Sequence, residues 1–320
     1  MSLLDVRDLI VEFPTRRGVL RALDGISFSI EGGEILGVVG ESGAGKSLTG
    51  AAIVGLLERP GRIAGGEIRL DGQRINNLPP EPLRRIRGRR IGTIFQDPLT
   101  TLNPLYTISR QLTETMQTHM RLSDAEARRR AIGWLDRVGI PAAADRIDAY
   151  PHEFSGGQRQ RVVIALALCA EPALVIADEP TTALDVSIQA QIITLLKDLT
   201  RDHGTAVMLI THDMGVVAET ADRVAVMYAG RIVEIGPTAA VIRRPAHPYT
   251  DGLMASIPAL EHRVDRLRQI DGAMPRLEAI PPGCRFHPRC PHVFGRCTEQ
   301  QPGLLEAGVT RAACWLHDRG

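Results

Sequence analysis

The chain has 320 residues, and its 38 lysines and arginines nearly balance its 37 aspartates and glutamates, which leaves a formal net charge of +1. This length can bury a core without disulfide bonds and allows one large α/β domain with an appendage, while the balanced charge argues against a basic surface for nucleic acid or an anionic membrane. The longest apolar run, residues 162–170, is about half of a bilayer-spanning helix, and charged residues interrupt residues 1–13 where an export signal would be apolar, so we expect neither a membrane span nor export.

Apolar periodicity predicts strands and helices in the first half of the chain. Residues 3–13 and 22–40 are predicted strands, and residues 34–40 form a short apolar run typical of a parallel sheet. A helix is predicted for residues 46–59, followed by strands at residues 66–72 and 90–95. From about residue 96 to residue 153 the pattern is helical, with a capping-box signature at Ser123–Glu126. With the segment that follows, we assign about residues 96–160 to an inserted helical subdomain.

Strands and helices alternate again in the second half. Strands are predicted at residues 173–178, 205–212 and 223–230, and a helix at residues 186–204 connects the first two. This order implies a parallel sheet with crossover helices. After about Pro245 the composition shifts to proline, arginine and histidine with little periodicity. The sequence therefore predicts an α/β domain over residues 1–244 and a loop-rich C-terminal extension over residues 245–320.

A glycine-rich segment directly follows the apolar run at residues 34–40. Its sequence GESGAGKS fits the pattern G-x-x-x-x-G-K-[ST], whose glycines let backbone N–H groups curl around a phosphate. The lysine can reach the β and γ phosphates of ATP, the hydroxyl after it can bind Mg²⁺, and the start of the next helix adds a positive dipole end. A glycine-rich turn that matches by chance is the alternative. The predicted phosphate loop consists of Gly40, Glu41, Ser42, Gly43, Ala44, Gly45, Lys46 and Ser47.

Two carboxylates end the apolar strand predicted at residues 173–178. Successive residues at a strand end point in different directions, so one carboxylate can hold Mg²⁺ through water while the other polarises the attacking water. We assign Asp178 to the metal and Glu179 to the general base. Two solvated acids at a strand end are the alternative, which a nearby phosphate loop disfavours.

Between these two motifs lies the segment EFSGGQRQR. Its serine and glycine N–H groups would head a helix whose dipole faces an anion. The segment closely resembles the signature of the ATP-binding cassette (ABC) ATPases, carried here by Ser155, Gly156, Gly157 and Gln158. The resemblance implies a P-loop ATPase fold of the α/β class, with a parallel core sheet, an antiparallel β subdomain and an inserted helical subdomain. It also implies a head-to-tail dimer in which the signature contacts the γ-phosphate held by the opposite subunit.

Four further positions match the ABC pattern in chain order, within a resemblance that covers about residues 3–240. By resemblance, Gln96 contacts the Mg²⁺ ion and the attacking water and links to the transmembrane partner, and Asp185 ends a loop that crosses the dimer interface. His212 resembles the switch histidine that contacts the γ-phosphate, with a structural histidine as the alternative. Phe13 stands where the family places an aromatic side chain that stacks on adenine, although an inward-facing strand phenylalanine would have the same sequence.

Several segments resemble a narrower group, the ATP-binding subunits of bacterial dipeptide and oligopeptide importers: QDPLTTLNPLYTI, YPHEFSGGQRQR, VMYAGRIVEIG, HPYTDGL and GCRFHPRCP. This resemblance implies a peripheral ATPase at the cytoplasmic face of the cell membrane. It would pair with a second, related ATPase chain beneath two transmembrane permease subunits, which an extracytoplasmic substrate-binding protein serves. Nickel, glutathione or another small solute is an alternative to peptide. A non-transport ABC regulator that binds nucleic acid is a further alternative, which the near-zero net charge disfavours.

Four of the five cysteines lie in the predicted extension, whereas Cys169 follows the signature on an apolar segment and is expected to be a small buried side chain. In a reducing cytosol, grouped cysteines are more often metal ligands than disulfides. Their spacing lacks the C-x2-4-C pairs usual in structural zinc sites, so we expect a [4Fe–4S] cluster, with zinc as the alternative and unligated thiols as a third option. Arg285, Arg289 and Arg296 are expected to offset the charge of the thiolates. The predicted ligands are Cys284, Cys290, Cys297 and Cys314.

Overall fold

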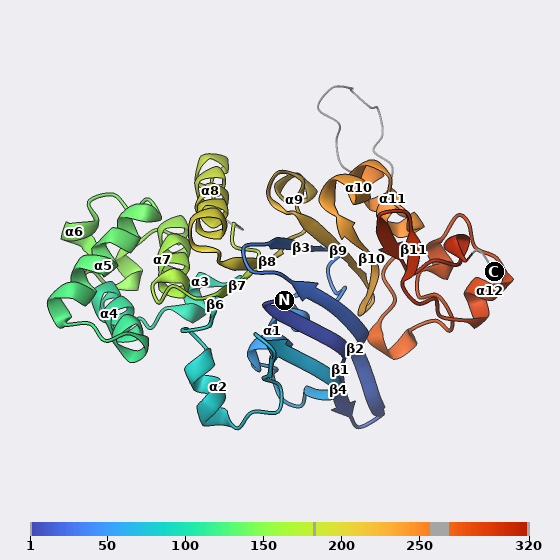
Figure 1. Cartoon of the computed structure of the whole chain (residues 1–320), viewed down its shortest axis with the longest axis horizontal. Helices are drawn as coiled ribbons and strands as arrows, with labels where there is room; N and C mark the ends of the chain where they lie inside the picture. Colours follow the sequence, from blue (N-terminus) through green and yellow to red (C-terminus); the bar gives the residue numbers. More distant parts are fainter. Residues whose placement is uncertain (1, 182–183, 257–268, 319–320) are drawn as a thin grey trace. The chain divides into compact units, whose positions relative to one another are not determined.

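The computed structural model describes residues 2–181, 184–256 and 269–318, and Figure 1 shows their helices and strands. The chain divides into two compact units, each assembled from several segments. The first unit consists of Met1–Leu3, Ile30–Ile35 and Asn77–Leu209, and the second of Leu4–Ser29, Leu36–Asn76 and Ile210–Gly320. The predicted boundary between residues 244 and 245 lies inside the second unit and stays a prediction.

The first unit contains a short parallel arrangement of strands. They lie in the order β8 (Ala206–Ile210), β7 (Leu174–Asp178), β6 (Ile91–Ile94). Strands β6 and β7 pair in parallel, with Ile91 opposite Leu174 and Ile94 opposite Ala177. Every residue of β8, and every residue of β7 before Asp178, is buried, which matches the continuous apolar runs that predicted parallel strands here.

Helices make up most of the rest of the first unit. They are α2 (Pro80–Ile86), α3 (Pro98–Thr101), α4 (Ile108–His119), α5 (Asp124–Arg137), α6 (Ala143–Arg146), the 3-10 helix η1 (Pro151–Glu153), α7 (Gly156–Leu168) and α8 (Val186–His203). Helices α4, α5 and α7 pack against one another, as Figure 1 shows at the green end of the ribbon. Thr107 and Ser123 cap α4 and α5 by accepting hydrogen bonds from backbone N–H groups. The predicted helical stretch between residues 96 and 153 is thus present, with the start of α5 at the predicted cap.

An antiparallel sheet forms the first part of the second unit. Its strands lie in the order β2 (Gly18–Ile30), β1 (Leu4–Thr15), β4 (Arg62–Leu70), β5 (Gln73–Arg74). On β1 the side chains of Leu4, Val6, Leu9 and Val11 are buried, and the residues between them are more exposed. The break in strict alternation coincides with the register shifts between Arg7 and Val11 in the β1–β4 pair.

A second group of strands in this unit lies in the order β3 (Ile35–Val39), β9 (Arg223–Tyr228), β10 (Arg231–Pro237), β12 (Thr310–Ala312), β11 (Leu305–Ala307). Strands β3 and β9 are parallel, and the later pairs are antiparallel. The C-terminal extension therefore adds strands beside β10 through the pair Glu234 and Ala312. The sequence predicted only loops here, because three-residue strands are too short to show a period.

The helices of the second unit are α1 (Lys46–Val54), α9 (Met214–Thr220), α10 (Thr238–Arg243), α11 (Pro248–Ala255), η2 (Leu277–Ala279), η3 (His287–Arg289), α12 (Gly295–Glu299) and η4 (Trp315–His317). Helix α1 ends earlier than predicted, because Gly55 adopts a left-handed conformation and its N–H bonds back to Ala51 and Ala52.

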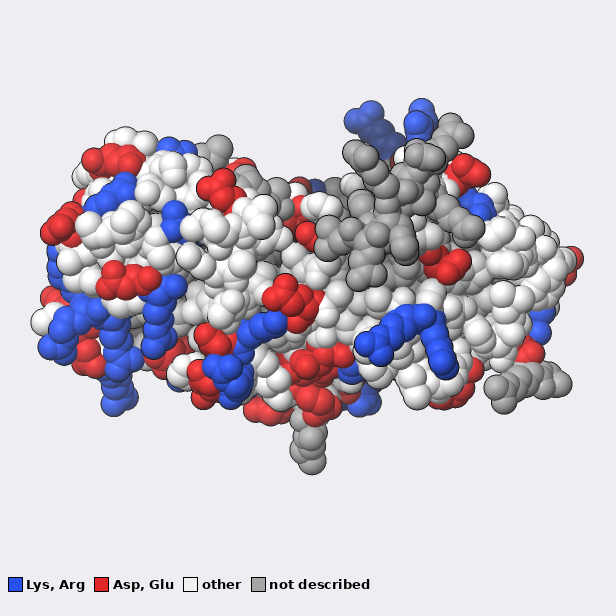
Figure 2. Space-filling model, turned by 90° about the horizontal axis from the view of Figure 1, so that it is seen from above, with Lys and Arg blue, Asp and Glu red and all other residues white. Residues whose placement is uncertain are grey.

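Two surface properties can be compared with the composition. Within the described ranges, no helix combines the length and apolar character needed to cross a membrane. On the face drawn in Figure 2, basic and acidic side chains are interspersed, in keeping with the small net charge.

Candidate active site

The predicted phosphate loop, Gly40–Ser47, connects strand β3 to helix α1 in the second unit. Gly40, Gly43 and Gly45 have φ angles of 148°, 81° and 103°, a region that favours glycine. A side chain would not fit at two of them: a Cβ on Gly40 would overlap the carbonyl oxygen of Met227, and one on Gly45 would lie 2.7 Å from Leu23 Cδ2. The glycines of the motif are therefore required by backbone conformation and by close neighbours.

Lys46 lies folded over the phosphate loop. Its Nζ donates hydrogen bonds to the carbonyl oxygens of Gly40, at 2.8 Å, and Glu41, at 3.1 Å, and the side chain is largely buried. Helix α1 starts after Gly45, which has no side chain to cap the first N–H groups. An ammonium group and a helix start without a side-chain cap on one loop fit the phosphates of a nucleotide.

The carboxylates of the second motif lie in the first unit. Asp178 ends strand β7, and Glu179 follows with a φ of 48°, a left-handed conformation that is strained for a non-glycine residue. Gln96 Nε2 donates a hydrogen bond of 3.1 Å to Glu179 Oε2. The structure thus brings together two of the predicted catalytic residues that are 83 positions apart in the chain.

The signature segment begins helix α7 with a reciprocal cap. Ser155 Oγ accepts a hydrogen bond from the N–H of Gln158 at 3.4 Å, and Gln158 Oε1 accepts one from the N–H of Ser155 at 3.1 Å. Because these two side chains satisfy each other's backbone N–H groups, the start of α7 is held in one conformation. Gly156 and Gly157 then supply the first N–H groups of the helix, where its dipole is positive.

Sequence analysis missed one residue that connects the signature helix to the carboxylates. Gln160 is buried, and its Nε2 donates a hydrogen bond of 3.0 Å to the carbonyl oxygen of Pro180, directly after Glu179. The sequence offered no signal for this contact, because Gln160 stands between Arg159 and Arg161 in the polar first half of the helix. Asp185 is the N-cap residue of α8, and its side chain makes no capping hydrogen bond to that helix. Ala183 of the same predicted loop lies outside the described residues.

The two remaining predicted residues belong to the second unit. His212 is exposed and follows strand β8, where the N–H of its neighbour Thr211 donates to the carbonyl oxygen of Val38. Phe13 is partly buried on β1, and a Cβ on Gly61 would lie 2.8 Å from Phe13 Cε1, so the ring covers that glycine. The predicted site residues therefore form two groups, one in each unit: Gln96, Ser155–Gln158, Asp178, Glu179 and Asp185 in the first, and Phe13, the phosphate loop and His212 in the second.

Comparison with known families identifies the family to which these site residues belong. The family described as ABC transporter matches residues 23–182, and the region described as "Oligopeptide/dipeptide transporter, C-terminal region" matches residues 233–297. The chain belongs to the ABC transporter family. Within it, the chain is an ATP-binding subunit of the oligopeptide and dipeptide group, because both matches occur together and its relatives align over nearly the whole chain.

Two curated relatives show the extent of this similarity. The oligopeptide transport ATP-binding protein AppD of Bacillus subtilis is 45% identical over 99% of this chain and 97% of its own length. The oligopeptide transport ATP-binding protein OppD of Escherichia coli is 48% identical over 94% of this chain and 89% of its own length.

Solved ABC cassettes have the same fold. A dimeric ATP-binding cassette bound to ADP and phosphate aligns with a TM-score of 0.68 and 29% identity, over 73% of this chain and 98% of that one. A component of the cbiONQ ABC transporter complex of Clostridium perfringens aligns with a TM-score of 0.63 and 31% identity, over 76% of this chain and 91% of that one. The predicted P-loop fold of the α/β class is therefore confirmed.

The cysteines of this ABC ATPase are not assembled as predicted. Over residues 2–181, 184–256 and 269–318, no three His, Cys, Asp or Glu side chains form a group that could hold a metal ion. The four thiols nevertheless share one neighbourhood: the N–H of Cys284 donates to the carbonyl oxygen of Cys297 at 2.8 Å. Burial, with smaller contributions from the charges of Cys297, Cys290 and Cys314, raises the pKa of Cys284 to about 11. The thiols are thus neighbours whose described side-chain positions do not form a metal-binding group.

The three arginines near these cysteines have other partners. Arg285 forms an ion pair with Asp24 at 2.5 Å, Arg289 with Glu41 at 3.1 Å and Arg296 with Asp318 at 2.5 Å. Each one already faces a carboxylate, so these contacts do not support the expectation that the arginines offset thiolate charge, and it stays a prediction. Cys169 is buried at the end of α7, burial raises its pKa to about 12, and it is the small buried side chain that was expected.

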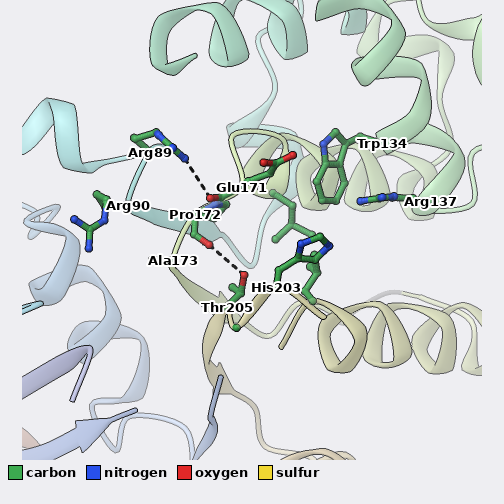
Figure 3. A pocket seen from close by; sticks show the side chains of 12 residues that line it. Arg89, Arg90, Trp134, Arg137, Glu171, Pro172, Ala173, His203 and Thr205 are labelled. Carbon is green, nitrogen blue, oxygen red and sulfur yellow. Dashed lines mark hydrogen bonds between the residues drawn. The ribbon is translucent and has the colours of Figure 1, made fainter. Parts of the chain in front are cut away.

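A separate pocket of about 410 Å³ lies in the first unit, and Figure 3 shows its lining. Arg89 and Arg90 from the turn before β6, Arg137 from α5 and His203 from α8 line it, while Trp134 forms an apolar wall. Two hydrogen bonds join residues of this lining to each other. Arg89 donates to the carbonyl oxygen of Glu171 at 3.3 Å, and Thr205 donates to that of Pro172 at 3.3 Å. None of the predicted site residues lines this pocket, so it is distinct from the nucleotide motifs.

Proposed function

We propose that this chain is the ATP-hydrolysing subunit of an importer that carries di- or oligopeptides across the cytoplasmic membrane. The observation that carries the proposal is the combination of a complete phosphate loop, a Gln96–Glu179 pair and a capped signature helix in one chain that also matches the oligopeptide transporter C-terminal region. The relatives aligned over nearly its full length are named as oligopeptide transport ATP-binding proteins.

ATP binding falls to the phosphate loop and α1. The N–H groups of the loop and the Lys46 ammonium hold the β and γ phosphates, and Ser47, Gln96 and Asp178 are the residues that would hold Mg²⁺. The metal ion neutralises charge on the phosphate oxygens when it is bound. Phe13 contributes a π face for the adenine, and His212 contacts the γ-phosphate.

Hydrolysis requires an oriented water and a base. Glu179 accepts the proton of the water that attacks the γ-phosphate, and the bond from Gln96 holds Glu179 Oε2 in a fixed direction. The left-handed backbone at Glu179 supports this role, because such strain is concentrated at functional positions.

A second cassette completes each ATP site. One chain holds one phosphate loop and one signature, so Ser155 and the N–H groups of Gly156 and Gly157 contact the γ-phosphate held by another cassette, and Asp185 lies at the interface. The dimeric state of a solved relative bound to ADP and phosphate supports this arrangement. We propose that the second cassette is a related but distinct chain.

The surface that contacts the permease subunits lies near Asn103 and Leu105. Leu105 is 80% exposed, and Asn103 Oδ1 accepts a hydrogen bond from its N–H at 3.0 Å. The side chain of Gln111 also holds this loop. Its Oε1 accepts a hydrogen bond from the N–H of Asn103, and its Nε2 donates one to the carbonyl oxygen of Asn103, both at 3.0 Å. A rigid loop that presents one apolar side chain suits insertion into a partner, here two transmembrane subunits served by an extracytoplasmic binding protein.

We also propose that the four cysteines of the C-terminal extension hold an iron–sulfur cluster. Four thiols in one neighbourhood have the donor chemistry for a [4Fe–4S] cluster, or for zinc, and a bound cation would offset the mutual repulsion of their thiolates. The arrangement of the side chains as described does not by itself make that site. We assign the cysteines no step in the transport cycle.

The proposed function is tested in the complex reconstituted in vesicles with its binding protein. ATP turnover should rise when a di- or oligopeptide is supplied, and labelled peptide should accumulate only when Mg-ATP is on the side of this subunit. Accumulation of nickel, glutathione or another solute, with no effect of peptides, would move the assignment to that substrate. Stimulation of turnover by nucleic acid would favour the non-transport alternative.

A further inference from the structure

The C-terminal extension is hydrogen-bonded to the phosphate loop at one residue, Glu41. Arg289 Nη1, in η3, donates hydrogen bonds of 3.1 Å to both carboxylate oxygens of Glu41. Tyr249, in α11, accepts a hydrogen bond of 2.8 Å at its hydroxyl oxygen from the N–H of Glu41. Both the side chain and the backbone of this loop residue are therefore bound by parts of the chain that lie more than 200 positions away.

Arg289 is held in place by its other contacts. Its side chain is 7% exposed, its Nε donates to the carbonyl oxygen of Asp271 at 2.9 Å, and its Nη2 donates to that of Ile270 at 3.2 Å. Its Cζ lies 5.8 Å from the centre of the Tyr228 ring. A guanidinium fixed on several sides positions its carboxylate partner without losing further side-chain freedom.

Tyr249 is fixed by a cluster of aromatic rings. Its ring centre lies 4.7 Å from that of Tyr228 and 5.4 Å from that of Phe286, and all three side chains are buried. Burial raises the pKa of Tyr249, so its hydroxyl stays protonated near neutral pH. The hydroxyl oxygen that receives the Glu41 N–H is therefore part of a packed core.

The same short segment also reaches the other end of the loop. Arg285 pairs with Asp24 and donates a hydrogen bond to the carbonyl oxygen of Ala229. The next residue, Gly230, donates its N–H to the carbonyl oxygen of Ala44 at 2.9 Å. Two arginines four positions apart thus support the loop near its beginning and near its end.

We propose that Arg289 and Tyr249 are positioning residues, through which the C-terminal extension holds the phosphate loop in the conformation that binds the nucleotide phosphates. The inference rests on the proposed function as an ATPase. A loop that is ordered before the ligand arrives does not lose conformational entropy on binding. If the ordered form becomes a minor state, the apparent Kd rises by the inverse of its population.

Arg289→Ala in the full chain should therefore weaken binding of Mg-ATP, measured with a fluorescent ATP analogue, by about tenfold. In the assembled transporter it should raise the KM for ATP by a similar factor and change kcat by less than about threefold, since bound phosphates order the loop themselves. Tyr249→Phe keeps the ring and loses the hydroxyl, so a smaller rise in Kd is expected.

Arg296→Ala is the matched control, because Arg296 also pairs with an acid in the extension, Asp318, and contacts the Trp315 ring without touching the loop. It should leave Kd and KM unchanged. The Glu41→Gln variant completes a double-mutant cycle: in that background, Arg289→Ala should have a much smaller effect on Kd. Thermal unfolding of each variant separates a loss of fold from a loss of loop order.

Three results would overturn the inference: an unchanged Kd in Arg289→Ala, an equal rise in Arg296→Ala, or full additivity of Glu41→Gln and Arg289→Ala. If Arg289→Ala does not fold, Arg289→Lys and Tyr249→Phe answer the same question with smaller changes. A wild-type chain that binds no ATP would instead defeat the proposed function, so the two failures are distinguishable.

Discussion

The predicted catalytic groups and the C-terminal extension differ in how their polar side chains are used. Gln96 and His212 are exposed and Glu179 is partly buried, whereas His247 is 1% and Tyr249 0% exposed. Gln96, His212 and Glu179 thus stay accessible to ligand and water, while the two residues of the extension are buried and bonded within the fold. Lys46 is the exception among the predicted ligand-binding groups, because its bonds to its own loop bury it. Substitutions at the accessible catalytic groups should therefore change turnover or affinity, and a substitution at His247 should change stability. Tyr249 should affect both, because its hydroxyl oxygen also accepts a hydrogen bond from the N–H of Glu41.

The strongest test of this contrast is Glu179→Gln. Turnover in the assembled transporter should fall by about 10²–10⁴-fold, because a positioned base is lost, while Mg-ATP still binds. Thermal unfolding should be nearly unchanged, because the bond from Gln96 can still be accepted by the amide oxygen. Glu171→Gln is the matched control, since Glu171 is an exposed acid away from the predicted site residues. Near-normal turnover in Glu179→Gln would remove this residue from its role.

Lys46→Ala should produce the next largest effect, on affinity. Charge-assisted hydrogen bonds contribute about 1.5–3 kcal/mol each, so the Kd for Mg-ATP should rise by about 10–100-fold. Lys197 is the other lysine of the chain and lies on α8, which makes Lys197→Ala a suitable control. Titration calorimetry measures both variants, and equal affinities for Lys46→Ala and wild type would contradict the phosphate-loop assignment.

These two regions also differ in how far sequence could predict them. The glycines and lysine of the phosphate loop, with its flanking strand and helix, lie between Ile35 and Val54, so a local pattern describes nearly the whole geometry. Sequence analysis did not predict strands β10, β11 and β12. Whether such a segment forms a strand depends on the strand that it pairs with, which the local sequence does not show. The contact between Arg289 and Glu41 spans 248 positions, and no spacing rule reaches that far.

Acid should test the supporting region. Burial and the nearby His317 lower the pKa of His247 from 6.5 to about 3, and its Nδ1 accepts a hydrogen bond from the N–H of Tyr249 at 3.0 Å. Between these pKa values the unfolded chain binds a proton that the folded chain excludes. The free energy of unfolding should therefore fall as the pH is lowered from about 6.5 toward 3, by up to about 1.4 kcal/mol per pH unit for this group.

His247→Asn separates this contribution from other acid effects. Asparagine can accept the same hydrogen bond at the start of α11 and does not titrate, so chemical unfolding at several pH values should show a weaker pH dependence below 6.5 than the wild type. His203→Asn, on the exposed end of α8, should retain the wild-type slope. Identical slopes for His247→Asn and the wild type would show that His247 does not carry the effect.

The smallest effect on turnover is expected from the four neighbouring cysteines, none of which belongs to an ATPase motif. Cys297→Ser keeps the backbone bond that the carbonyl oxygen of residue 297 accepts from Cys284, and Arg289 keeps its carboxylate partner, so ATP turnover should change by less than about threefold.

The metal content of Cys297→Ser should change completely if the thiols bind a [4Fe–4S] cluster. Protein purified without oxygen should then contain iron and acid-labile sulfide, and Cys297→Ser should contain neither. Cys169→Ser is the control, since a serine hydroxyl can replace the bond from Cys169 Sγ to the carbonyl oxygen of Leu166. Zinc without sulfide would favour the alternative metal. If the wild-type protein contains neither iron nor zinc, the four cysteines are unligated thiols, which agrees with their described side-chain positions.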